Sequence, residues 1–275
     1  MLIIIKFSNF LKNIIKLIKV LFANYGIKIK KPLSITYLLC LYLIQLVQYY
    51  IKYKKSSSPF VKKFPISLKS LIPIVSDIND QSGSASGVYF HQDIWAAKKI
   101  YNQRPKTHVD IGSRIDGFVS HLLVFMPVKV IDIRPLVSQD TNLTFLQSDA
   151  TNLKEIKDNS IKSLSSLHAA EHFGLGRYGD IINPDGTFVF IENLIRVLKP
   201  EGRLYFSVPI GKEKLIYNAN RVFSPYTILE AFDKLSLLEF SVIEKKGKLI
   251  NNACIEKWIE KNYCCGLFIF TKDKV

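Results

Sequence analysis

The first 76 residues of the 275-residue chain contain no acidic residue and no arginine, and their only charged side chains are thirteen lysines. Because the formal net charge of the whole chain is +15, residues 77–275 carry only about +2. A nearly neutral main region argues against a basic groove along it. Arginine is the side chain that most often makes bidentate contacts with phosphate and guanine, and residues 1–76 contain none. The sequence therefore predicts no nucleic-acid partner.

Cysteine is also scarce. No two of the four cysteines, Cys40, Cys254, Cys264 and Cys265, are spaced as C-x-x-C. This spacing favours reduced side chains over a disulfide framework. No small-residue cleavage site follows the first apolar run, so we expect no cleaved secretory signal. The expected location is the cytoplasm or the cytosolic face of a membrane.

Residues 1–65 are expected to form a basic, apolar, helical extension that ends in a linker rich in serine, proline and lysine, KYKKSSSPFVKKFP. Residues 1–22 intersperse lysines in an apolar run, as membrane-surface helices do. Residues 33–51 are uncharged and nearly reach the length of about 20 residues that a bilayer span requires. Three alternatives remain open for this extension. Residues 1–55 bind peripherally to an anionic membrane, residues 33–51 span a membrane, or the helices pack on the main domain.

The main domain, expected over residues 66–275, alternates between helical and strand patterns from Asp93 onward. Strands are expected at THVDIG, VKVIDI, NLTFLQSD, SIKSLSSLHA and GRLYFSVP, with helices between most of them. LLEFSVIEKKG and CCGLFIFTK then follow as two further strands. The predicted fold class is α/β: a doubly wound, mostly parallel, Rossmann-like sheet with an antiparallel C-terminal strand pair.

The first strand leads into HVDIGSRIDGFVSHLL, in which Gly112 would let the backbone approach a ligand and Gly117 would begin a helix. This is not G-x-G-x-x-G, and an aspartate beside a pyrophosphate would repel it, so a cofactor without phosphate fits better. Two later strands also end in acids. Asp132 has the spacing of a carboxylate that accepts hydrogen bonds from ribose, and Asp149 is a candidate for an adenine amine. The alternative for each acid is a helix N-cap.

Five segments in order, VDIGSRIDG, VIDIRPL, QSDATNL, LHAAEHFG and RVLKPEGRLYFSVP, resemble the motifs of class I S-adenosylmethionine-dependent methyltransferases. The LKPEGRL turn between a helix and the fifth strand is the most specific of them. The resemblance covers residues 93–275. More narrowly, SGSASGVYFHQDIW, HVDIGSRIDGFVSHL, SSLHAAEHFGLGRYGD and LYFSVPIG resemble a methyltransferase-like family of unknown function. The cofactor that the resemblance implies is S-adenosylmethionine.

The resemblance also implies which residues bind that cofactor. It assigns the methionine moiety to Asp110, Gly112 and Ser113, the ribose to Asp132, and the adenine to Asp149 with Ala150. His168, at the end of the fourth strand, is also assigned to cofactor binding. Arg114 departs from the family, because it stands at the position of the second glycine. This departure is the basis for an alternative function, a non-catalytic binding or scaffold protein that keeps the fold.

The acceptor site is expected after the fourth strand, in LHAAEHFGLGRYGD. Its candidate catalytic residues are Glu171, His172, Arg177, Tyr178 and Asp180. Methyl transfer requires mainly that the acceptor be aligned and lose a proton, and a histidine near its ordinary pKa accepts a proton at neutral pH. Loop capping and a satisfied core histidine are the structural alternatives. A segment expected to fold over the same cleft contains Tyr89, His91 and Gln92.

The predicted function is methyl transfer to a hydroxyl or amine of a small molecule or glycan. A second alternative is a zinc hydrolase, because residues 168–172 spell H-x-x-E-H. Two histidines four residues apart ligate zinc only on a helix, and the segment follows a strand and meets Gly174 at once. Glu192 is the one candidate for a third ligand. We therefore expect no metal.

Overall fold

The structure is a computed structural model that describes residues 32–75 and 82–274. The chain divides into two compact units, Met1–Gly83 and Ser84–Val275. The boundary expected from composition, between residues 65 and 66, stays a prediction. The helix expected within residues 1–22 lies outside the described residues.

The described part of the first unit is helical. Helix α2 spans Pro32–Lys55 and includes the apolar stretch expected at 33–51, and it is followed by the short helices α3 (Pro59–Lys62) and η1 (Leu68–Ser70). Three lysines in the last turn of α2 complement the negative end of its dipole. None of the described helices, α2 included, combines the length and the apolar character that crossing a bilayer requires.

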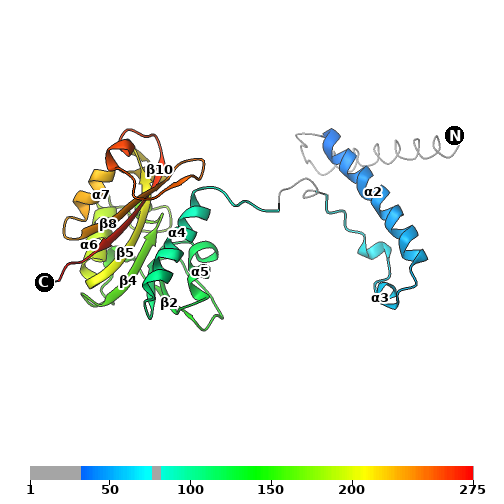
Figure 1. Ribbon diagram of the computed structural model, residues 1–275, viewed down its shortest axis with the longest axis horizontal. Helices are drawn as coiled ribbons and strands as arrows, with labels where there is room; N and C mark the ends of the chain where they lie inside the picture. The colour runs from blue at the N-terminus through cyan, green and yellow to red at the C-terminus, as the bar shows by residue number, and fades with distance from the viewer. Residues whose placement is uncertain (1–31, 76–81, 275) are drawn as a thin grey trace. The chain divides into compact units, whose positions relative to one another are not determined.

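The second unit is built on an eight-stranded sheet with the order β3-β2-β1-β4-β5-β10-β8-β9 (Figure 1). Its strands are β1 (His108–Ile111), β2 (Val128–Asp132), β3 (Leu143–Gln147), β4 (Ile161–Leu167), β5 (Leu198–Ile210), β8 (Ser236–Ile243), β9 (Leu249–Ile250) and β10 (Cys264–Thr271). The first five strands are parallel. Strand β10 lies between β5 and β8 and is antiparallel to both. The predicted fold class, with its antiparallel C-terminal pair, is confirmed.

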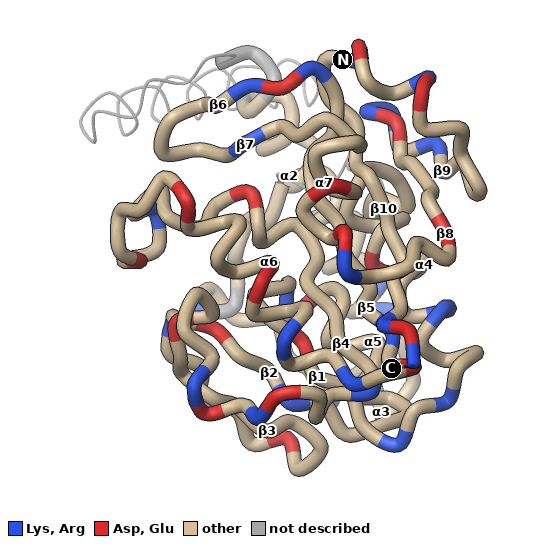
Figure 2. The backbone as a smooth tube through the Cα atoms, turned by 90° about the vertical axis from the view of Figure 1, so that its left-hand side faces the viewer, with Lys and Arg blue, Asp and Glu red and all other residues tan. Residues whose placement is uncertain are grey.

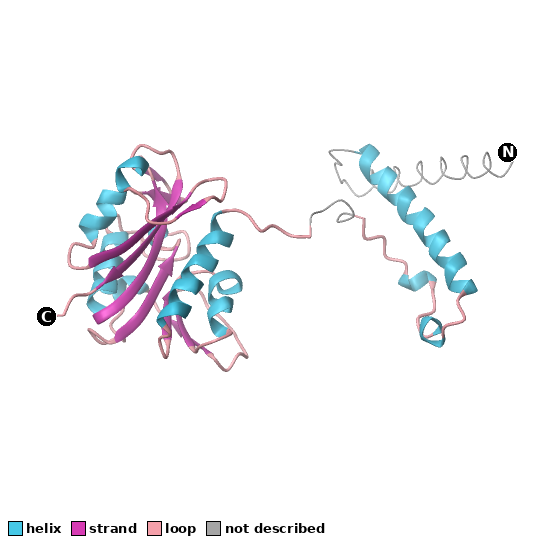
Figure 3. Ribbon diagram, viewed as in Figure 1, coloured by secondary structure: helices cyan, strands magenta, loops and turns pink. Residues whose placement is uncertain are grey.

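Helices cover both faces of this sheet (Figure 3). On one face lie α4 (Val88–Gln103), the π-helical turn η2 (Ile115–Val119) and α5 (Ser120–Leu123), which share a core with β2, β4, β5, β8 and β10. On the other lie α6 (Gly186–Val197) and α7 (Pro225–Ala231) with a larger core. The near-continuous apolar sequences of β10 and of residues 204–210 in β5 follow from burial on both faces. Cys264 and Cys265 are both buried and free, and they belong to opposite cores.

Three local features differ from the expected elements. The helix expected at GFVSHLLVF begins as a π turn, because the Val119 N–H bonds to the Arg114 carbonyl five residues back. A two-stranded hairpin, β6 (Lys214–Ile216) with β7 (Asn220–Val222), was not expected. The LKPEGRL turn lies inside β5, where Glu201 has a φ of 59°. In Figure 2 basic and acidic residues are interspersed along the elements of the second unit, as its small net charge implies.

Candidate functional site

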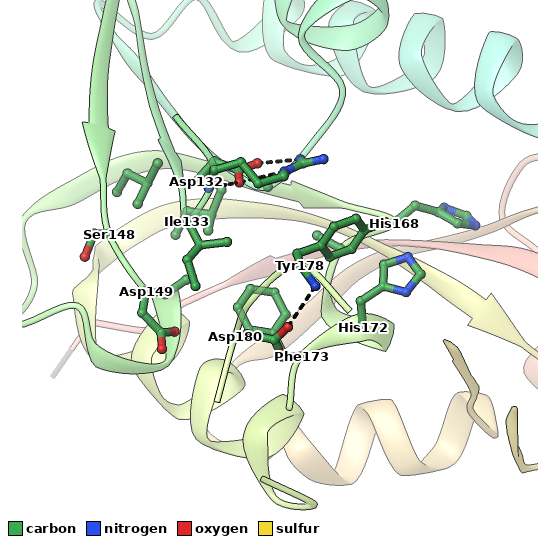
Figure 4. A pocket seen from close by; sticks show the side chains of 15 residues that line it. Asp132, Ile133, Ser148, Asp149, His168, His172, Phe173, Tyr178 and Asp180 are labelled. Atoms are coloured by element: carbon green, nitrogen blue, oxygen red, sulfur yellow. Dashed lines mark hydrogen bonds and ion pairs between the residues drawn. The ribbon is translucent and has the colours of Figure 1, made fainter. Parts of the chain in front are cut away.

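A cleft of about 570 Å³ lies at the carboxyl ends of β1, β2, β3 and β4, and it adjoins a wider hollow of about 1350 Å³ (Figure 4). Eight of the twelve predicted site residues line the cleft: Gly112, Asp132, Asp149, Ala150, His168, His172, Tyr178 and Asp180. Ser113 lines the hollow, whereas Asp110, Glu171 and Arg177 line neither.

The turn after β1 is shaped for close approach to a ligand. Gly112 has a φ of 74°, and its N–H bonds to the Ile131 carbonyl at 3.0 Å. A Cβ at this position would lie 3.0 Å from the Cβ of Ala169, which also lines the cleft. Only glycine therefore keeps both the backbone conformation and the open wall.

Asp110 supports this turn from inside the protein. Its carboxylate accepts hydrogen bonds from the Ser113 N–H at 3.1 Å, from the Ser113 hydroxyl at 2.6 Å and from the Ser165 hydroxyl. The Ser113 hydroxyl in turn accepts from the Leu167 N–H at 2.9 Å, which ties the turn to β4. Burial raises the pKa of Asp110 to about 6. The structure thus places Asp110 beneath the turn, away from the cleft.

Arg114, at the position of the family's second glycine, has an ordinary extended backbone with φ −73° and ψ 127°. Any residue adopts this conformation, so the turn does not need glycine here. Its guanidinium forms an exposed ion pair with Asp116 at 3.2 Å and lies 5.2 Å from the ring of Tyr89. The substitution therefore leaves the backbone of the turn intact.

Asp132 ends β2 in the cleft, but an arginine covers its carboxylate. Arg134 donates from Nε at 3.0 Å, from Nη2 at 2.7 Å and from its backbone N–H at 2.9 Å. A carboxylate offers about four lone-pair sites, so roughly one remains for a ligand while Arg134 stays in place. The Arg134 guanidinium also lies 4.8 Å from the ring of Tyr178.

Asp149 and Ala150 follow β3 at the other end of the cleft. Asp149 accepts hydrogen bonds from the Thr151 N–H at 2.9 Å and the Thr151 hydroxyl at 2.8 Å, so it caps the short turn that follows. Ala150 is buried and lines the cleft without a polar side chain. The capping role that the sequence left open for Asp149 is thus present in the structure, beside an open cleft wall.

Two histidines lie at the end of the cleft away from Asp149 (Figure 4). His168 Nδ1 lies 2.5 Å from the Gln92 side-chain oxygen, and burial lowers the pKa of His168 to about 3. His172 Nδ1 lies 2.6 Å from the Ala219 carbonyl, and burial lowers its pKa as well. Because both partners only accept, each Nδ1 carries the proton and each Nε2 keeps a free lone pair.

Glu171 lies between these two histidines in the sequence. Its side chain is buried and does not line the cleft. Its Oε1 lies 3.8 Å from His172 Nε2, and its Oε2 has no hydrogen-bond partner among the described residues. Burial raises the pKa of Glu171 to about 8, so the carboxyl group is protonated at neutral pH.

The loop after His172 is held mainly by Asp180. Its carboxylate accepts from the N–H groups of Gly174, Gly176 and Tyr178 at 2.8, 3.2 and 3.2 Å. Arg177 is exposed and donates to the Ala219 carbonyl at 3.0 Å. Asp180 and Arg177 are therefore engaged with backbone, whereas the Tyr178 ring packs edge-on against His172 with 5.5 Å between centroids.

Sequence reasoning missed Arg134, which lines the cleft, and misplaced Gln92. Arg134 was assigned no role, although its place two residues after Asp132 on the same strand end was a usable signal. Gln92 was expected on a segment that folds over the cleft, but it is buried in α4 against His168.

The H-x-x-E-H segment has no helix of the length that zinc ligation by its histidines requires. His168 directly follows β4 and has a φ of 50°, and Ala170–His172 form a single tight turn. Glu192 is exposed on α6 and lies outside the cleft. Within residues 32–75 and 82–274, no group of three or more His, Cys, Asp and Glu side chains is placed to hold a metal ion.

The cleft residues fit the cofactor that the resemblance implies. Gly112 leaves the wall open where a Cβ would fill it, Asp132 presents a carboxylate with roughly one lone-pair site to spare, and Ala150 offers an apolar surface. The two basic side chains nearest to the Gly112 turn in the lining of the hollow, Arg114 and Arg134, are paired with Asp116 and Asp132. This donor set suits a ribose and an adenine without a pyrophosphate.

The comparisons with known proteins agree with this fold. Residues 142–253, less than half of the chain, match a family described as Caenorhabditis protein of unknown function, DUF268. The chain has no match among the curated proteins. Among solved structures, the [4+2]-cyclase SpnF superposes with a TM-score of 0.50 and 13% sequence identity, over 66% of this chain and 81% of its own.

Two other similar structures are named as methyltransferases. The 1,6-didemethyltoxoflavin-N1-methyltransferase of Burkholderia thailandensis, solved with S-adenosylhomocysteine, has a TM-score of 0.49 and 13% identity over 66% of this chain and 79% of its own. The N-methyltransferase NodS of Bradyrhizobium japonicum was also solved with S-adenosylhomocysteine. It has a TM-score of 0.47 and 12% identity, over 73% of this chain and 92% of its own. Ser84–Val275 has a Rossmann-like α/β fold that is similar to the fold of SpnF, and residues 142–253 match a family of unknown function.

Proposed function

We propose that the chain is an S-adenosylmethionine-dependent methyltransferase that acts on a hydroxyl or amine group of a small molecule or glycan. The single observation that carries this proposal is the shared cleft. The open Gly112 turn and the Asp132 carboxylate, which suit the cofactor, line the same cavity as His172, whose Nδ1 is hydrogen-bonded to the Ala219 carbonyl. A cofactor and an acceptor group can thus meet in one place.

When bound, S-adenosylmethionine supplies an electrophilic methyl group, and the protein has to orient the acceptor and take its proton. His172 is suited to the proton transfer. Its Nδ1–H is committed to the Ala219 carbonyl at 2.6 Å, and its lowered pKa keeps Nε2 unprotonated at neutral pH. As the acceptor O–H or N–H bond breaks, its proton passes to Nε2.

The second candidate function is binding without catalysis. It is favoured by Arg134, which holds the Asp132 carboxylate in three hydrogen bonds and thereby competes with a ribose. SpnF, which has a similar fold, is named as a cyclase, so the fold by itself does not fix the reaction.

Tritiated S-adenosylmethionine offered with a panel of sugars, phenols and amines tests the proposal. We expect transfer to at least one class, and His172→Ala should lower the rate by about 100-fold or more, the usual contribution of a general base. The affinity for S-adenosylhomocysteine should change little, and His121→Ala, an exposed histidine outside the cleft, is the matched control. Equal rates in the wild type and His172→Ala would contradict this role, and cofactor binding without any transfer would favour the second candidate.

A further inference from the structure

His168 is held rigidly at the junction of the strand end and the cleft. Its backbone lies in the left-handed region, with a φ of 50°, which a non-glycine residue adopts at a cost. Its N–H donates to both the Ser207 carbonyl at 2.9 Å and the Ser207 hydroxyl at 3.0 Å on the neighbouring strand β5. These contacts fix the position of the His168 backbone, from which the imidazole extends.

Gln92 determines which imidazole nitrogen carries the proton. The Gln92 Nε2 donates to Asp93 Oδ1 at 3.1 Å, which directs Oε1 toward His168. Oε1 accepts from the Ser207 hydroxyl at 2.8 Å and lies 2.5 Å from His168 Nδ1. An amide oxygen has no proton to give, so Nδ1 must be the donor. The side chains of Gln92, His168 and Ser207 are all buried.

The other nitrogen, His168 Nε2, is buried and has no hydrogen-bond partner among the described residues. Such atoms are rare in folded proteins because an unmade hydrogen bond costs free energy. His168 borders both the cleft and the wider hollow, and the exposed ring of Tyr89 packs against it with 5.3 Å between centroids. A ligand group that turns Tyr89 aside would reach Nε2.

We propose that Gln92 is a positioning residue that holds His168 as its Nδ1–H tautomer, so that Nε2 accepts a hydrogen bond from a hydroxyl or amine group of the acceptor substrate. The identity of the ligand rests on the proposed function, whereas the tautomer does not. This division gives the two histidines different roles. His168 is neutral at all moderate pH values and orients the acceptor, while His172 takes the proton.

Long-range proton–nitrogen NMR of the full chain tests the tautomer directly, with the His168 signals identified by their loss in His168→Asn. We expect the wild type to show Nδ1–H and a bare Nε2. Gln92→Met should lose most of the Nδ1–H signal. Gln92→Glu should keep this signal because it retains an acceptor oxygen. The control, Gln103→Met on the same helix, should leave the His168 signals unchanged. An Nε2–H tautomer in the wild type, or an unchanged tautomer in a folded Gln92→Met, would overturn the inference. If Gln92→Met does not fold, the wild type and Gln92→Glu still decide it.

Phenol and aniline, with anisole as a probe of similar shape that has no donor, test the ligand class on the same samples. Phenol or aniline should move the Nε2 resonance of the wild type in the direction of hydrogen bonding, and anisole should not. A response to S-adenosylhomocysteine instead of phenol or aniline would assign Nε2 to the cofactor and overturn the substrate part. A response to phenol in a protein that does not bind S-adenosylhomocysteine would support the subsite while the proposed function failed.

Discussion

At the scale of single residues, burial decides the charge of the groups around the cleft. It lowers the pKa of His168 to about 3 and raises the pKa of Glu171 to about 8 and of Asp110 to about 6. At neutral pH the histidine and the glutamic acid are therefore uncharged. An ion pair between Asp132 and Arg134 borders the cleft, together with the side chains of Asp149 and Asp180.

Glu171 makes stability depend on pH. Its pKa is about 8 in the folded protein and near 4.5 when unfolded, so its stabilising contribution is complete below about pH 4.5 and is lost as the pH rises through 8. We expect Glu171→Gln, which cannot ionise, to reduce the loss of unfolding free energy between pH 6 and pH 9 by more than about 1 kcal/mol. Urea denaturation at the two pH values measures this. Parallel curves for the wild type and the variant would contradict the burial of an ionisable carboxyl group.

The sequence identified the two strand-end acids that line the cleft but misplaced Asp110. The register pairs Ile111 with Ile131, so the residue level with Asp132 is Gly112, and Asp110 lies two positions inside the sheet. An aspartate before a glycine looks like a strand end in sequence, but the exact end depends on the pairing of neighbouring strands, which a single sequence does not contain. For the same reason the contact between Gln92 and His168, 76 positions apart, was not predictable.

At the scale of elements, every expected strand of the main sheet is present, because each contains a short run rich in apolar residues. The β6–β7 hairpin lacks such a run, and all three residues of β6 are exposed. Polar contacts hold it in place: Arg221 donates to the Phe173 carbonyl at 2.7 Å, and the Ala219 carbonyl accepts from His172 and Arg177. Contacts between distant segments leave no periodic pattern, so the hairpin could not be predicted.

The turn between β1 and η2 gives a test with a matched control. Gly112 and Gly179 both have positive φ values, 74° and 84°, but a Cβ meets Ala169 only at Gly112 and meets nothing within 4 Å at Gly179. Each glycine-to-alanine change should lower the free energy of unfolding by about 1 kcal/mol, because alanine is strained at a positive φ. Only Gly112→Ala should also weaken binding of S-adenosylhomocysteine, because it narrows the cleft.

Thermal unfolding and calorimetric titration of the two variants separate these effects. Equal losses of affinity in Gly112→Ala and Gly179→Ala would show that the turn after β1 has no special role in binding.

At the scale of the whole molecule, the charge is divided between the two units. Residues 1–55 hold ten lysines and no acid, and α2 ends in three of them. Each lysine near an anionic membrane contributes about 1 kcal/mol, so we predict peripheral binding that weakens as salt rises. The full chain should sediment with phosphatidylserine vesicles at low salt and not with neutral ones, and a chain without residues 1–55 should stay in solution. Equal sedimentation of the two chains would rule this segment out as the anchor.

The central claim is that the cleft binds S-adenosylmethionine through Asp132, and calorimetric titration of the full chain with S-adenosylhomocysteine tests it most directly. Because Arg134 leaves roughly one lone-pair site on the carboxylate, Asp132→Ala should remove about one charge-assisted hydrogen bond. That loss is about 1.5–3 kcal/mol, or a weakening of about ten- to hundred-fold. Glu260→Ala, an exposed acid outside the cleft, should bind like the wild type. No binding by the wild type at millimolar ligand, or equal affinity in Asp132→Ala, would contradict the claim.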